Sequence, residues 1–187
     1  MQPLAATRVP SEASDEVGLI IALLVRFPQL ATIVSHPANG TLVLSFAVRS
    51  KLDRRVAAEL RESISEHVRS LLELRHERHD ALGVTCESDE ALGFVRITRD
   101  VRSFSREELL LLVALLSDRF GVNLVQSPPS SDEAPQDEGD VDDLVEYAIE
   151  AFREPGQQRS LVGFREEKRV LVYFVKSRKK AKARARP

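Results

Sequence analysis

Residues 105–121 read SREELLLLVALLSDRFG and form the most clearly marked helix of the chain. Ser105 followed three residues later by Glu108 has the spacing of a capping box, and Gly121 can end the helix in the left-handed conformation. Apolar side chains recur at helical spacing at Leu109, Leu112, Val113, Leu116 and Phe120. The stretch therefore predicts an amphipathic helix with both ends defined.

The residues on either side of this helix complete a recognisable order of elements. Residues 41–49, TLVLSFAVR, place apolar side chains at every second position, which predicts a half-buried strand. Asp53 can cap a long helix that continues to about residue 77. Residues 81–86 and 92–98 predict a hairpin around the polar loop 87–90, and residues 122–126 predict a last strand. The order β-α-β-β-α-β predicts an α+β, ferredoxin-like domain with an antiparallel sheet backed by two helices.

The N-terminal flank predicts one further helix. Residues 1–14 have no periodicity and are expected to be loose, whereas an apolar stripe of helical spacing begins after Asp15. Pro28 interrupts this stripe because proline lacks a backbone donor. A short helical piece is expected at residues 28–34, so that residues 15–127 would comprise a helix followed by the ferredoxin-like domain.

The C-terminal third predicts a smaller second unit. Residues 128–139 are rich in proline and acids and are expected to form a flexible acidic linker. An amphipathic helix followed by two apolar runs then predicts an αββ unit at residues 140–176. A unit of this size is too small to be stable alone, so it is expected to dock on the first domain or on a partner. Residues 177–187 are expected to form a basic tail.

Charge along the chain is segregated although the formal net charge is only −2. Residues 131–150 contain acids and no base, whereas the last dozen residues contain bases and no acid. Cys86 is the only cysteine, which excludes an intrachain disulfide and fits a reducing compartment. The longest apolar run, residues 17–25, is about half of the length that spans a bilayer. The expected location is cytoplasmic, with no membrane partner.

The basic tail is the most evident candidate binding segment. It offers charge for several phosphates, and binding driven by counterion release needs no fixed structure. RNA, the ribosome or another polyanion is therefore the expected partner. A solubilising tail, or one that pairs with the acidic linker, is the alternative. The predicted nucleic-acid-binding residues are Lys176, Arg178, Lys179, Lys180, Lys182, Arg184 and Arg186.

A second candidate surface lies on the predicted sheet. Residues 90–97 resemble half of the third-strand pattern of RNA-recognition motifs, since Gly93, Phe94 and Val95 match it, but only one stacking aromatic is present. Alternation places Phe94 and Arg96 on the face away from the two helices, where they are candidate contact residues. That face is expected to be covered by the N-terminal helix, by the C-terminal helix or by a second protomer.

No pattern in the chain predicts catalysis, a metal site or a cofactor. Glu73, His76 and His79 have ligand spacing on a helix, but interleaved arginines oppose a divalent cation. Cys86 is surrounded in sequence by acids, which predicts a structural thiol. Two functions follow as hypotheses. One is a non-enzymatic accessory protein that binds RNA or another polyanion through its tail, and the other is a regulatory or scaffold protein that acts by dimerisation or by docking on a partner.

Overall fold

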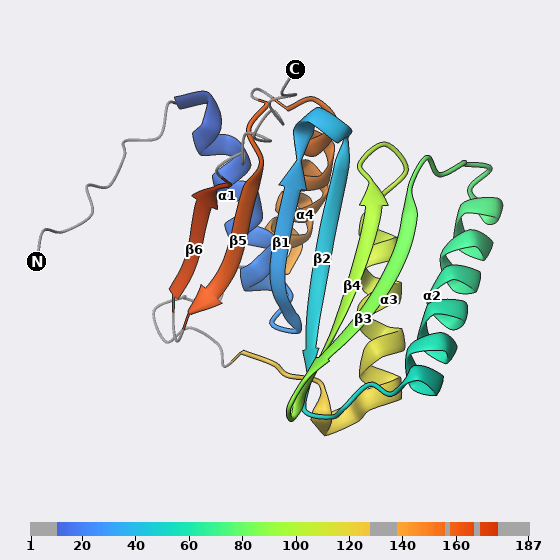
Figure 1. Ribbon diagram of the computed structural model, residues 1–187. Helices are drawn as coiled ribbons and strands as arrows, with labels where there is room; N and C mark the ends of the chain where they lie inside the picture. Colours follow the sequence, from blue (N-terminus) through green and yellow to red (C-terminus); the bar gives the residue numbers. More distant parts are fainter. Residues whose placement is uncertain (1–10, 128–137, 156–157, 167–168, 176–187) are drawn as a thin grey trace, which may run out of the picture.

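The computed structural model describes residues 11–127, 138–155, 158–166 and 169–175, which form one antiparallel sheet with helices packed on one face (Figure 1). Two short 3₁₀ turns, η1 (Pro37–Asn39) and η2 (Gly121–Asn123), join the longer elements. In chain order these are α1 (Ser11–Arg26), β1 (Leu30–His36), β2 (Thr41–Val48), α2 (Arg54–Leu74), β3 (Leu82–Asp89), β4 (Leu92–Asp100), α3 (Arg106–Phe120), α4 (Glu138–Arg153), β5 (Leu161–Glu166) and β6 (Arg169–Phe174).

The sheet of the described residues has six strands in the order β3-β4-β2-β1-β5-β6. Each neighbouring pair is antiparallel, and three hairpins, β1–β2, β3–β4 and β5–β6, supply the strands. The hairpins meet where β2 pairs with β4 and where β1 pairs with β5. The C-terminal hairpin therefore extends the same sheet that the earlier strands begin.

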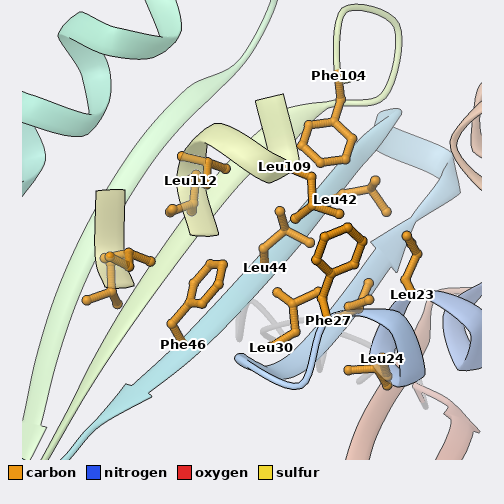
Figure 2. Close-up of a cluster of buried hydrophobic side chains, with 14 of the residues drawn as sticks. Leu23, Leu24, Phe27, Leu30, Leu42, Leu44, Phe46, Phe104, Leu109 and Leu112 are labelled. Carbon is orange, nitrogen blue, oxygen red and sulfur yellow. The ribbon is translucent and has the colours of Figure 1, made fainter. Parts of the chain in front are cut away.

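The core lies on one face of this sheet. Registered residues on that face, such as Leu44 opposite Ile33 and Ile97, are fully buried. Each of the four described helices contributes buried apolar side chains to the same cluster. Figure 2 shows part of it, where Leu23 of α1, Phe27 just after α1 and Leu109 of α3 gather over β2. Burying a Leu or Phe side chain contributes about 1.5–3 kcal/mol, so this packing holds all the helices on the same side.

The predicted N-caps Asp53 and Ser105 are confirmed. The Asp53 carboxylate accepts a hydrogen bond from the Val56 N–H at 2.8 Å, and the Ser105 hydroxyl accepts one from the Glu108 N–H at 3.2 Å. Gly121 follows α3 with a φ of +50° and a ψ of −124°, so it ends the helix outside the left-handed helical conformation that was predicted. The second half of the predicted capping box is different, because the Glu108 carboxylate bonds the Arg99 side chain.

The α+β class is confirmed, but the ferredoxin-like strand order is not. Residues 122–126, predicted to be the last strand, contribute η2 and an isolated bridge between Leu124 and Val48. The position beside β2 that residues 122–126 were expected to take is occupied by β1. Most of β1 falls in residues 28–34, which were predicted to be a short helical piece. A register shift between Leu30 and Thr32 puts buried residues three apart, at Leu30 and Ile33, which imitates helical spacing. The β-branched run from Thr32 to Val34 favours the strand.

The β3–β4 hairpin is tighter than expected. The predicted loop 87–90 is mostly strand, and only Glu90 and Ala91 separate β3 from β4. Glu90 adopts a φ of +41°, a conformation that glycine tolerates best. The predicted apolar runs 161–164 and 169–175 do form the hairpin β5–β6.

Candidate functional site

One face of the sheet carries no described helix, and it is the candidate site. We call it the uncovered face (Figure 1). Strand registers place its side chains in two rows that cross the whole sheet. The first row, from β3 to β6, is Thr85, Arg96, Ser45, Thr32, Phe164 and Leu171. The second is Gly83, Thr98, Val43, Val34, Val162 and Tyr173.

The chemistry of the uncovered face changes from one end to the other. Hydroxyl-bearing residues dominate the β3–β4–β2 end, and apolar residues dominate the β1–β5–β6 end. Phe164 and Tyr173 stack there with ring centroids 5.8 Å apart, and Tyr173 is 53% exposed. Charge within the two rows is limited to Arg96. This end of the face therefore presents an apolar, partly exposed surface in the residues that the structure describes.

Phe94 and Arg96 lie on the uncovered face, where alternation placed them. Phe94 is half-buried between its registered neighbours Ala47 and Glu87. Arg96 forms an ion pair with Glu87 across the β3–β4 hairpin, and its side chain remains 40% exposed. Their proposed contact role stays a prediction.

The expectation that the N-terminal helix covers this face is wrong. α1 packs on the opposite face, where Ile20 and Leu24 lie against Gly163 of β5. The C-terminal helix α4 packs on α1 and not on the uncovered face. A Cβ atom at Gly163 would overlap Ile20 and lie 3.1 Å from Leu24 Cδ1, so the helix approaches the strand backbone closely at this glycine. A second protomer, the third predicted cover, stays a prediction.

Gly93, which matched the RNA-recognition pattern, has a packing role in this fold. A Cβ atom there would lie 2.7 Å from the Ser50 carbonyl oxygen and 2.6 Å from Leu52 Cγ. The loop before α2 therefore crosses β4 at van der Waals distance, and the Ser88 hydroxyl accepts a hydrogen bond from the Leu52 N–H at 2.8 Å. The glycine is explained by this crossing without a nucleic-acid role.

The densest ionisable cluster of the described residues was not predicted. Arg99 is fully buried at the end of β4, and its guanidinium donates to both carboxylate oxygens of Glu108, at 2.5 and 3.0 Å. It also donates to Asp100 Oδ1 at 2.5 Å, to Ser103 Oγ at 2.9 Å and to the Ala81 carbonyl. We call Arg99, Asp100, Ser103 and Glu108 the buried clasp.

Asp100 ties the clasp to two loops. Its carboxylate accepts hydrogen bonds from the Asp80 and Ala81 N–H groups at 3.1 Å, and from the Ser103 N–H and hydroxyl at 3.0 and 2.7 Å. Burial alone would raise the pKa of Asp100, but these hydrogen bonds and the Arg99 charge hold it well below its usual value. Burial raises the pKa of Glu108 despite its bonds to Arg99. The side chains of the clasp are hydrogen-bonded to one another and buried from solvent. The clasp therefore stabilises the fold and offers no surface for a ligand.

The sequence contains a signal that could have revealed the clasp. Arg99 continues the buried alternation of Val95 and Ile97, so an arginine stands where the pattern requires an apolar residue. A buried arginine needs an acid, and Asp100 and Glu108 lie nearby in sequence. The same reasoning would have assigned the Glu108 carboxylate to Arg99 and not to the backbone N–H at the start of α3.

The remaining candidates from the sequence are a metal site, the Cys86 thiol and the basic tail. The part of the chain that the structure describes contains no cluster of three or more His, Cys, Asp or Glu that could hold a metal ion. Cys86 is half-buried, and this burial raises the pKa of its thiol. Within the same residues no helix is long and apolar enough to cross a membrane. The basic tail residues 176–187 lie outside the described residues.

Comparison with known proteins gives no relative. No protein-family model matches the chain, and no curated protein or solved structure matches it either. Its function must therefore be inferred from its own residues.

Proposed function

We propose that this chain is a binding protein and that the uncovered face is the surface on which it contacts another protein. The observation that carries this proposal is the placement of all described helices on the opposite face. An antiparallel sheet can expose one face to water, but such a face is then usually lined by polar residues. Here Val34, Val43, Val162, Phe164 and Leu171 lie on it.

The lining favours a protein over a polyanion as the partner at this face. Arg96 is the only base in the two rows, and Glu87 already neutralises it. Apolar and aromatic side chains beside hydroxyl-bearing residues are typical of protein interfaces, where a desolvated centre borders a polar rim. We expect the β1–β5–β6 end to form that centre.

Photo-crosslinking tests the proposal on the full chain in its own cells. A photoreactive amino acid at Thr98, opposite Val43 on the uncovered face, should give a discrete crosslinked product. The control position is Glu66, which is exposed on α2 and points away from this face. Adding Val43→Lys should reduce the Thr98 product at least about tenfold, because a buried unpaired charge weakens association by more than 1.4 kcal/mol. Equal products from Thr98 and Glu66, or none from Thr98, would contradict the proposal.

A second candidate function rests on the segregation of charge in the sequence. Lys176, Arg178, Lys179, Lys180, Lys182, Arg184 and Arg186 form a run of bases without an acid. We propose that this run binds RNA or another polyanion electrostatically. If all seven bases neutralised phosphates of a single strand, the logarithm of the affinity would fall with the logarithm of salt with a slope of about −5.

Filter binding to mixed-sequence RNA at several salt concentrations tests this candidate. Deleting residues 176–187 should abolish both the affinity and its salt dependence. Deleting the acidic residues 131–139 should tighten binding, because they would no longer compete with RNA for the tail. An affinity that survives loss of the tail, or that does not respond to salt, would rule the candidate out.

A further inference from the structure

The two edges of the sheet are protected differently. In an antiparallel strand, alternate residues direct their N–H and C=O groups to opposite sides. At the β3 edge, the Asp100 N–H donates to the Ala81 carbonyl, so the residues that face outward are Leu82, Val84, Cys86 and Ser88. The Arg61 Nε of α2 donates to the outward Val84 carbonyl at 3.2 Å. Helix α2 thus packs beside this edge and satisfies part of it.

The β6 edge lacks such a cover among the described residues. The Val175 N–H donates to the Ser160 carbonyl at 2.7 Å, so Val175, Tyr173 and Leu171 direct their backbone groups to β5. The outward groups then belong to Val170, Val172 and Phe174. No hydrogen bond from the described part of the chain reaches them. Edge strands of this kind are usually blunted by charge or proline, yet residues 170–175 read VLVYFV.

We infer that the β6 edge pairs antiparallel with β6 of a second copy of this chain, about a two-fold axis at Val172. Side chains alternate between the two faces of a strand. When two copies of β6 pair antiparallel, opposite residues share a sheet face only if their two residue numbers are both even or both odd. In the register centred on Val172, this residue lies opposite Val172 of the second copy. The outward N–H and C=O groups of the two residues then hydrogen-bond each other. The two sheets become one continuous sheet with all helices on the same side.

The sequence of β6 fits a second copy in this register. Leu171 lies opposite Tyr173 of the other copy, and Val170 lies opposite Phe174, so apolar side chains meet on both faces. Arg169 falls opposite Val175, which separates the two like charges. Ile21, on the helix that packs over β5 and β6, is 37% exposed. A second copy alongside β6 brings new surface next to this helix. The pairing uses the edge and leaves the uncovered face free, so it does not depend on the proposed function.

Sedimentation equilibrium of the full chain tests the pairing. We expect the mass to approach twice 20.9 kDa as the concentration is raised to about 0.1 mM. This concentration range detects weak dimers as well as tight ones. Val172→Pro removes an outward N–H that the β5–β6 ladder does not use, and it should weaken the dimer by roughly a hundredfold or more. Cys86→Pro, which removes an outward N–H of the other edge, is the matched control and should leave the dimer intact. A monomeric wild-type chain, or equal effects of both prolines, would overturn the inference.

A disulfide test fixes the register and does not require a disruptive variant. In a Cys86→Ser background, Val172→Cys should form an intermolecular disulfide on mild oxidation, because the paired Cα atoms of such a register lie about 5.5 Å apart. Arg169→Cys should not, since its copy lies six residues away along the partner strand. Adding Thr98→Lys to the Val172→Cys chain should leave the yield of the disulfide-linked dimer unchanged. This result would separate the β6 interface from the uncovered face. Crosslinking through residue 169 instead of 172 would refute the register.

Discussion

The two halves of the sheet are stabilised by different interactions. In the β2–β4–β3 half, the buried clasp connects the end of β4 to the start of α3, and its partners are at most a few tens of residues apart. In the β1–β5–β6 half, α1 lies against Gly163 of β5, and the His36 Nδ1 and Ser160 Oγ atoms are 2.9 Å apart across 124 residues of chain. The first half depends on satisfied charges and the second on close apolar packing between distant segments. Each half should therefore fail under a different substitution.

The largest effect is expected from Arg99→Leu in the first half. It leaves Glu108 and Asp100 buried without their counter-charge, which should cost about 3–5 kcal/mol of unfolding free energy. The control is Arg96→Leu, three residues earlier on the same strand, whose exposed pair with Glu87 should cost less than about 1 kcal/mol. Urea unfolding measures both. Equal losses would mean that the clasp does not stabilise this half.

The next effect is expected from Gly163→Ala in the second half. The added methyl group overlaps Ile20, so α1 must shift, and the cost should be about 1–3 kcal/mol. Gly83→Ala is the matched control, because a Cβ there lies 3.7 Å from Thr98 Cβ, an ordinary contact. Combining Gly163→Ala with Ile20→Ala should recover part of the loss, as measured by a double-mutant cycle in urea. If the two losses of unfolding free energy simply add, the cost of Gly163→Ala does not arise from its overlap with Ile20 of α1.

Acid should act on the β2–β4–β3 half through the clasp. The pKa of Asp100 is lower in the folded protein than in the unfolded chain, so its contribution is complete above the unfolded pKa near 4 and is lost as pH falls towards the folded value. The pKa of Glu108 is raised, so that its ionisation costs stability as pH rises through its folded pKa. Asp100→Asn should therefore flatten the fall in stability below about pH 4, and Glu108→Gln should not. The measurement is chemical unfolding between pH 2 and 7, and a fall of unchanged steepness in Asp100→Asn would contradict it.

The two halves also differ in how far the sequence predicted them. Period-two and helical spacing were sufficient for β2, α2, β4 and α3, because each of these elements has its own apolar stripe and the two helices also have their own N-caps. They were insufficient for β1, because the register shift after Leu30 hides its alternation. The pairing of β1 with β5 was also inaccessible, since no local pattern states which strand lies beside which. The residues that share the uncovered face followed from alternation alone, but which face the helices cover depends on contacts such as Gly163 with Ile20.

The smallest expected effect concerns the turn that closes the first half. Glu90 has a φ of +41°, which strains a residue that carries a Cβ atom, so Glu90→Gly should stabilise the protein by about 0.5–1 kcal/mol. Ala91→Gly is the control, since Ala91 has no positive φ and should gain nothing from the added freedom. The increase should appear in the urea midpoint and should persist in Arg99→Leu, because the turn and the clasp lie at opposite ends of the β3–β4 hairpin. A gain from Ala91→Gly equal to that from Glu90→Gly would place the strain elsewhere.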